Sequence, residues 1–322
     1  MKEDEVVITE PAAVAALLNI YQVNGPGNLE WDFATPGQVT ALDGSFEAKD
    51  GALIKLEIFQ AELHGEVLKL RGVATLAALN ANSNNLSGFD LENLPNLRSL
   101  SLSCNEISDL PSLAGLTELT VLELSFNKIE DLSPLAALTK LTNLDLLDNR
   151  ISDLSPLAKL TKLTVLDLKG NEISDLSPLA ALTELTSLNL DWNKTSDLSP
   201  LAGLTKLSDL GLWFNKVKNL SPLAGLTELT RLGLSENRIS DLSPLAGLTK
   251  LTSLGLAENR ISDLSPLAGL TKLTSLSLGK NKITDLSPLT GLLNLRRIYL
   301  EKCPVTDLSP LDQLPKLEKV DQ

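Results

Sequence analysis

Leucine and asparagine recur along this chain with a fixed period of 22 residues. Residues 251–272, LTSLGLAENRISDLSPLAGLTK, form a representative copy. Counted from the asparagine, leucine stands at minus eight, minus five and minus three, and isoleucine at plus two. A period in the twenties with this spacing indicates a repeat protein whose copies stack on one another. The asparagines of the regular copies are Asn105, Asn127, Asn149, Asn171, Asn193, Asn215, Asn237, Asn259 and Asn281.

Each copy predicts one short strand. The leucines at minus five and minus three are two residues apart, which places both on the buried face of a strand. The residues at minus four and minus two then lie on the opposite face, here termed the variable face. A single copy cannot bury its own leucines, so the strands of successive copies are expected to form a parallel sheet. We expect the asparagine amide to bind the backbone of the turn and of the neighbouring copy.

The second half of each copy predicts a single short 3₁₀ or α turn. The stretch Asp263-Leu264-Ser265-Pro266-Leu267 is an example. Serine is favoured as an N-cap, and proline is tolerated at the first helical position because its missing N–H would have no partner there. Little chain remains before the next strand, which favours one turn over a longer helix.

The repeat N-x-I-S-D-L-S-P-L-A-x-L-T-x-L, over roughly residues 94–317, resembles the 22-residue leucine-rich repeats of bacterial internalins. It is more loosely similar to the repeats of the phosphatase-regulator class. The resemblance implies a protein-binding horseshoe whose partner lies across the concave face. The expected fold is an α/β solenoid, a curved leucine-rich-repeat horseshoe with a parallel concave sheet, short 3₁₀ or α turns on the convex side and an N-terminal helical cap.

Two regions are expected along the chain. Residues 1–38 read as a tail followed by a helical cap, because apolar residues between 14 and 21 follow helical spacing and Gly25-Pro26-Gly27 ends the pattern. Residues 39–322 read as a solenoid of about twelve turns that includes degenerate terminal copies. In these copies Ala61, Asn84 and Cys303 occupy the asparagine position, and residues 39–46 are a candidate edge strand.

The composition narrows the choice of partner. The formal net charge is −13, from 28 basic and 41 acidic residues, which disfavours nucleic acid or an anionic membrane as partner. No apolar run approaches the length that spans a bilayer. The start, Met-Lys-Glu-Asp-Glu, lacks the basic and apolar regions of a signal peptide, so the chain is either cytoplasmic or a mature secreted or cell-surface fragment. We expect a monomer.

Few residues are suited to catalysis. His64 is the sole histidine, and no phosphate-binding glycine loop, zinc-type cysteine spacing or calcium loop is present. Cys104 and Cys303 occupy nearly equivalent positions nine repeats apart, too far for one disulfide. We therefore expect no enzymatic activity, no cofactor and no metal site.

Departures from the repeat consensus indicate where a partner binds. Trp213 stands at minus two, and Trp192 and Phe214 stand at minus one in adjacent copies; Leu147, also at minus two, extends this apolar surface. Gly211 and Gly233 leave room beside them. Clustered exposed aromatic side chains are typical interface anchors. The alternative is that Trp192 and Phe214 fold onto the rim of the turn and pack on their neighbours.

A row of acidic side chains is the second departure. Glu123, Asp145 and Asp167 stand at minus four in successive copies, and Asp191 and Asp209 lie nearby. Like charges on neighbouring strands destabilise a sheet, which favours a basic partner surface or a bound cation as the reason for keeping them. The alternative is a solvated acidic face, and Lys169 and Arg231 would neutralise part of it.

Three hypotheses follow. The first is a protein-recognition module that binds its partner on the concave face through the aromatic residues and their acidic flanks. The second is an intracellular regulatory scaffold for an enzyme such as a phosphatase. The third is an engineered consensus scaffold, suggested by the near-identity of copies such as residues 240–254 and 262–276.

Overall fold

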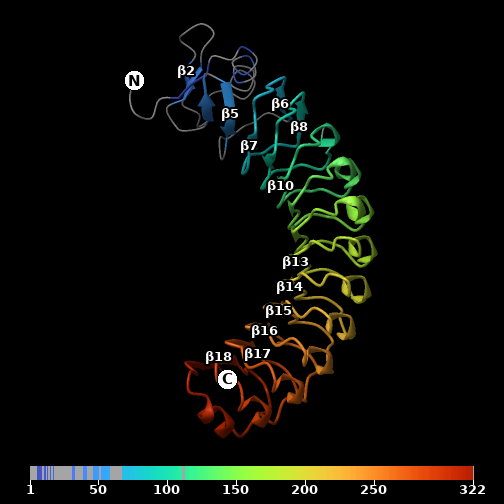
Figure 1. Cartoon of the computed structure of the whole chain (residues 1–322), viewed down its shortest axis with the longest axis vertical. Coiled ribbons are helices and arrows are strands. Elements are labelled where there is room, and N and C mark those ends of the chain that lie inside the picture. Colours follow the sequence, from blue (N-terminus) through green and yellow to red (C-terminus); the bar gives the residue numbers. More distant parts are fainter. Residues whose placement is uncertain are drawn as a thin grey trace. The chain divides into compact units, whose positions relative to one another are not determined.

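The computed structural model describes residues 6–8, 11, 13, 15, 17, 31–32, 39–41, 46–50, 52–58, 67–110 and 113–321. The chain divides into two compact units, Met1–Leu163 (unit 1) and Thr164–Gln322 (unit 2), which are described separately (Figure 1).

Unit 2 consists of parallel strands that alternate with 3₁₀ turns. Each strand pairs with the next one at a spacing of 22 residues, so that Leu188, Leu210 and Leu232 stand in one row. In Figure 1 the strands of this unit lie along its inner side and the turns along its outer side. The strands are β12 Val165–Asp167, β13 Ser187–Asn189, β14 Asp209–Gly211, β15 Arg231–Gly233, β16 Ser253–Gly255, β17 Ser275–Ser277, β18 Arg297–Tyr299 and β19 Lys319–Asp321. The turns are η4 Ser177–Leu179, η5 Ser199–Leu201, η6 Ser221–Leu223, η7 Ser243–Leu245, η8 Ser265–Leu267, η9 Ser287–Leu289 and η10 Ser309–Gln313.

The consensus leucines form a continuous core. In the copy marked by Asn237, the four template residues Leu229, Leu232, Leu234 and Ile239 are at most 2% exposed. Complete burial of such a side chain contributes roughly 1.5–3 kcal/mol, and the same positions are buried in the other regular copies. The predicted strand pattern and solenoid are confirmed.

The asparagine ladder also has the predicted role. The Nδ2 of Asn259 donates to the carbonyls of Leu234 and Leu256 at 2.9 and 3.1 Å, and its Oδ1 accepts the main-chain N–H of Ile239 at 2.9 Å. One side chain thus binds two consecutive copies. In the last copy the Sγ of Cys303 makes the ladder contact to a carbonyl, at 3.2 Å from Leu278 O.

The 3₁₀ turns begin where predicted, but the prediction of serine as the N-cap is wrong. In η8 the serine is the first helical residue and Leu264 precedes it without a side-chain cap. The Oδ1 of Asp263 accepts the Ser265 N–H at 2.8 Å. An aspartate two residues before the serine therefore satisfies the free donor at the start of the turn.

Unit 1 contains less regular copies. Its main sheet is parallel except that β4 pairs antiparallel with β5, and β6 and β8 form a separate parallel pair. A strand pair thus stands in these degenerate copies where a short turn was expected. The main-sheet strands are β4 Phe46–Lys49, β5 Ala52–Glu57, β7 Ala78–Asn80, β9 Ser99–Ser101, β10 Val121–Glu123 and β11 Asn143–Asp145. The separate pair is β6 Val67–Arg71 and β8 Gly88–Glu92, and the 3₁₀ turns are η1 Leu113–Gly115, η2 Ser133–Ala137 and η3 Ser155–Lys159.

The N-terminal segment contributes a small antiparallel sheet. Strand β3, Val39–Ala41, pairs with β1, Val6–Ile8, and with β2, Trp31–Asp32. Residues 6–8 are therefore a strand where a tail was expected. The expected helical cap falls outside the described residues except for the four isolated positions 11, 13, 15 and 17, and Ala61 and His64 also fall outside them.

Candidate protein-binding site

The residue at minus one has a left-handed backbone throughout the regular copies. Its φ is 57° in Trp192 and 54° in Phe214, and Glu236 and Glu258 have the same positive-φ conformation. Gly170 is the one glycine at this position. Because aromatic and charged residues adopt the same conformation, it belongs to the turn of the repeat and not to a special site. Trp192 and Phe214 are 43% and 45% exposed there.

Trp192, Trp213 and Phe214 form one group, here termed the aromatic cluster. The Trp192 and Phe214 rings are stacked, with centroids 4.5 Å apart and planes at 19°. The Trp192 ring meets Trp213 edge to face at 5.4 Å. Trp192 and Phe214 pack on neighbouring rings, and both also remain exposed to solvent.

Polar contacts on three sides fix Trp213. Its main-chain N–H donates to Asp191 Oδ1 at 2.7 Å, and its indole N–H donates to Glu236 Oε1 at 3.1 Å. The Nζ of Lys169 lies 5.8 Å from the ring centroid, within cation–π distance. Trp213 is half-buried on the variable face, between side chains of three other copies.

Gly211 leaves room for two side-chain oxygens beside this tryptophan. A Cβ at this position would lie 2.7 Å from Asn189 Oδ1 and 2.8 Å from Asp191 Oδ1. No side chain fits there while Asp191 accepts the Trp213 N–H. Gly233 differs, because the nearest heavy atom to a Cβ there would be 3.9 Å away.

The acidic residues have contacts that the sequence did not reveal. The Oδ1 of Asp145 accepts the main-chain N–H of Leu147 at 3.0 Å, and the Oδ1 of Asp167 accepts that of Lys169 at 2.9 Å. These carboxylates therefore satisfy backbone donors in addition to any role toward a partner. In unit 1 Glu123 Oε2 accepts the hydroxyl of Ser101 at 2.8 Å.

Asp191 has the most perturbed environment among these carboxylates. Burial raises its pKa above the ordinary value, Asp167 and Asp209 raise it further, and the Trp213 N–H and Lys169 oppose the shift. Asp209 is paired with Arg231, whose Nε lies 3.0 Å from its Oδ2. Asp191 itself has no basic side chain within 4 Å among the residues described.

The predicted site residues fall in both units. Unit 1 holds Glu123 on β10, Asp145 on β11 and the half-buried Leu147. Unit 2 brings the rest together around Trp213: Trp192, Phe214, Asp167, Lys169, Asp191, Asp209 and Arg231. Glu236 and Asn189 were not predicted. Glu236 follows Trp213 by 23 residues, which places it at minus one in the next copy. A carboxylate at that position after an outward-facing tryptophan is a sequence signal from which this contact could have been predicted.

A hollow of about 510 Å³ lies beside Trp213 on the variable face of unit 2. Its lining includes Gly211 and Gly233, which carry no side chain, together with Asp191, Glu236 and Ser235. This volume falls within the range of about 300–1,000 Å³ that is usual for ligand sites.

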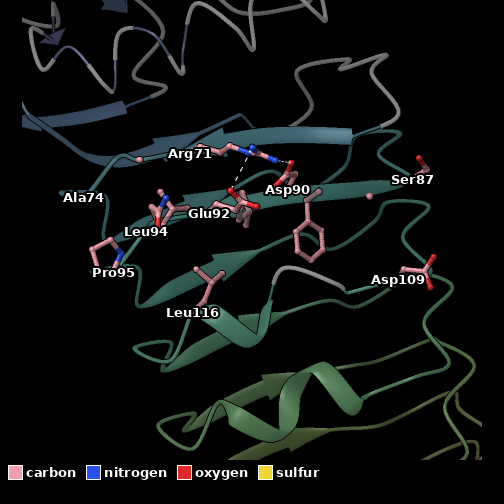
Figure 2. A pocket seen from close by; sticks show the side chains of 15 residues that line it. Arg71, Ala74, Ser87, Asp90, Glu92, Leu94, Pro95, Asp109 and Leu116 are labelled. Carbon is pink, nitrogen blue, oxygen red and sulfur yellow. Dashed lines mark hydrogen bonds and ion pairs between the residues drawn. The ribbon is translucent and has the colours of Figure 1, made fainter.

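A second hollow of about 1060 Å³ lies in unit 1 over β6 and β8. Figure 2 shows Arg71 of β6 extending toward Asp90 and Glu92 of β8. The Arg71 guanidinium is hydrogen-bonded to Asp90 and lies 3.5 Å from Glu92. The charges of this hollow are thus largely matched internally, and no residue selected from the sequence lies in it.

The ranges that the structure describes contain no group of three or more histidine, cysteine, aspartate or glutamate side chains able to hold a metal ion. No helix within those ranges is long and apolar enough to cross a bilayer.

Comparisons with known proteins agree with this architecture. A family profile of leucine-rich repeats, two copies at a time, matches residues 117–159, 161–203, 205–247 and 249–291, and a single-repeat profile matches 93–110. An internalin from Listeria monocytogenes, inlF, is 33% identical with a TM-score of 0.72, over 86% of this chain and 91% of that one. Internalin C2 of the same organism is 44% identical with a TM-score of 0.53, over 54% of this chain and 76% of that one.

A more distant match is TLR13 in complex with ssRNA13, 25% identical with a TM-score of 0.60, over 80% of this chain and 43% of that one. A comparison with curated protein sequences gives no match. The chain belongs to the leucine-rich-repeat proteins and, among them, to the bacterial internalin-like group.

Proposed function

We propose that this chain is a non-enzymatic recognition module that binds a partner protein on its variable face. The observation that carries the proposal is the aromatic cluster, in which Trp192 and Phe214 are nearly half exposed although they belong to a folded scaffold. Exposed tryptophan and phenylalanine side chains held by neighbouring contacts are the usual anchors of protein interfaces.

Acidic residues around the cluster give the partner its expected charge. Asp191, Asp209 and Glu236 surround Trp213, and the whole chain carries a net charge of −13. Such a surface favours a partner with a basic patch and speeds its association. In unit 1, Glu123, Asp145 and Leu147 are proposed separately as partner contacts.

The charge also bears on the type of partner. The similar structure of TLR13 is a complex with ssRNA13, so similarity of fold alone does not exclude nucleic acid. Here the carboxylates around the cluster would repel a phosphate backbone. A protein partner is therefore favoured.

Mutation of the anchor tests the proposal. Partner proteins recovered with the immobilised chain are identified, and one purified partner is then titrated against the wild type and its variants. Trp213→Ala should weaken binding at least about tenfold, as expected for an interface anchor. Leu293→Ala is the matched control, because Leu293 is also a large exposed apolar residue of unit 2, at 53%, but lies outside the cluster and the hollow.

The two variants separate the possible results. If Leu293→Ala leaves the affinity unchanged while Trp213→Ala lowers it, the cluster is the binding site. An unchanged affinity of the Trp213→Ala variant would remove the aromatic cluster from the interface. Circular dichroism of both variants confirms that the fold is retained.

A further inference from the structure

Main-chain N–H groups on the variable face are capped in some copies and open in others. The minus-two N–H is accepted by the minus-four side chain in the copies with Asp145, Asp167 and Asn189, at 2.9–3.1 Å. Because these acceptors are side chains of the variable face, the donor they reach is accessible from that face. The next three copies carry glycine at minus four, at Gly211, Gly233 and Gly255.

The hollow beside Trp213 contains two of the open donors. Trp213 replaces the missing acceptor with Asp191 of the preceding copy. The N–H groups of Ser235 and Ala257 have no acceptor among the described residues, and both residues line the hollow. This surface therefore offers hydrogen-bond donors to a ligand with carbonyl oxygens.

Two carboxylates beside the same tryptophan have no basic partner. Of the carboxylates lining the hollow, Asp209 is paired with Arg231, and Glu258 lies 2.5 Å from Lys280. Asp191 and Glu236 have no cation within 4 Å in the described part of the chain, and their only side-chain hydrogen bonds come from Trp213. The hollow is thus lined by the carboxylates of Asp191 and Glu236, by the Trp213 ring, and by Gly211 and Gly233, which have no side chain.

We propose that the variable face of β14 to β16 docks an extended segment of the partner that carries an arginine side chain. The guanidinium lies on Trp213 and pairs with Asp191 and Glu236. A main-chain carbonyl of the segment accepts the Ser235 N–H. The inference rests on the proposed function and names the chemistry of the partner at this position.

Arginine fits this combination better than lysine does. Its planar guanidinium stacks on an indole ring and offers several donors in a fixed fork, which suits two carboxylates on either side of a ring. A lysine ammonium would gain the charge but not the stacking. The Lys169 ammonium lies 5.8 Å from the Trp213 ring centroid but does not line the hollow.

The fold does not require glycine at position 233. A Cβ at residue 233 would have ordinary room, so Asn or Asp at Gly233 could cap the Ser235 N–H as Asn189 caps Asp191. Glycine at 233 instead leaves the donor and the hollow available. This observation favours a ligand over packing as the explanation.

Three synthetic peptides test the proposal: acetyl-Gly-Gly-Arg-Gly-Gly-amide, its citrulline analogue, which has the same shape without the charge, and its lysine analogue. They are titrated into ¹⁵N-labelled full-length chain while the Trp213 indole and Ser235 amide signals are followed by NMR. The arginine peptide should give saturable shifts of both signals with a Kd of roughly 1 mM. The citrulline peptide should bind at least tenfold more weakly, and the lysine peptide several-fold more weakly.

Asp191→Asn is the decisive variant. Asparagine retains an oxygen for the Trp213 N–H, as Asn82 does for the Ser103 N–H at 2.6 Å, so the fold is maintained while the charge is lost. Arginine-peptide affinity should fall at least tenfold. Asp285→Asn, a change of the same charge outside the hollow, should leave it unchanged.

Each remaining result contradicts a stated part of the proposal. Equal binding of the citrulline peptide, an unaltered affinity of Asp191→Asn, or no saturable shift up to about 10 mM peptide overturns it. Equal binding of the lysine peptide overturns the assignment to arginine. A shifted indole with an unmoved Ser235 amide overturns the carbonyl contact. If the peptides fail while Trp213→Ala still lowers affinity for the purified partner, the proposed function stands without this inference.

Discussion

Replacement of one ladder asparagine by alanine should measure how strongly the copies are joined. In Asn259→Ala the main-chain N–H of Ile239 loses its only hydrogen-bond acceptor among the described residues. Ile239 is completely buried, so its N–H is shielded from bulk water. The expected consequence is a local separation of two consecutive copies.

The magnitude follows from which groups lose their partners. The carbonyls that Asn259 binds keep another donor: Leu234 O still receives Asn237 Nδ2 at 3.1 Å, and Leu256 O still receives Asn281 Nδ2 at 2.9 Å. The unsatisfied Ile239 N–H therefore dominates the cost. One buried donor without a partner costs about 1–3 kcal/mol, and we expect the variant to lose about 2 kcal/mol.

Asn219→Ala is the matched control. Asn219 Oδ1 also accepts a main-chain N–H, that of Ser221 at 3.0 Å, but both residues are exposed and water can substitute. Its cost should be about 0.5 kcal/mol, the lower end for an intramolecular hydrogen bond. Urea unfolding measures both, and amide exchange at Ile239 localises the effect because repeat arrays do not always unfold in one step. An equal cost for the two variants would refute the dominance of the buried N–H.

Three further changes test single features of the repeat. Phe126→Gly should be about 1 kcal/mol more stable than Phe126→Ala, because only glycine adopts the left-handed turn without strain; equal denaturation midpoints would contradict this. Asp191→Asn should stabilise the fold at pH 7 by up to roughly 1 kcal/mol, because the raised pKa of Asp191 marks a charge that the folded state disfavours. That gain should disappear below about pH 3.9, where the carboxyl is protonated even in the unfolded chain. Asp263→Asn should have the opposite sign: the Ser265 hydroxyl and N–H lower the pKa of Asp263, so its charge stabilises above about pH 3.9 and the difference vanishes in acid. Urea titrations at pH 7 and in acid check both signs.

The scaffold was predictable because its residues repeat the same physical requirement. The spacing of Leu229, Leu232 and Leu234 determines which face of the strand is buried, and a period of 22 residues determines the strand register. The ladder role of asparagine followed from its donors and acceptor alone. The strand pair β6–β8 could not be predicted in the same way, since the copies that form it depart from the consensus on which the prediction depended.

The candidate site was predictable only in part. The outward position of Trp213 follows from strand alternation, and its contact with Trp192 follows from the stacking of adjacent copies. The left-handed turn of Trp192 and Phe214 could not be read from the sequence, because bulky residues are not expected at positive φ. The backbone contacts of Asp145 and Asp167 were also not predicted. Each carboxylate accepts the main-chain N–H of the residue two positions later, and the sequence alone does not distinguish this role from contact with a partner.

The hydrogen bond from the minus-two N–H to the minus-four side chain explains how one scaffold can present different surfaces without a change of backbone. The minus-two N–H is a donor that every copy must satisfy with its own side chain, with a neighbouring copy or with an external group. Asp167 satisfies it within the copy, and Asp191 satisfies it for Trp213 across copies. At Ser235 and Ala257 neither solution is used. The residue at minus four and the minus-two residue of the preceding copy therefore both affect whether this donor is capped, and they do so independently of the leucines that hold the solenoid together.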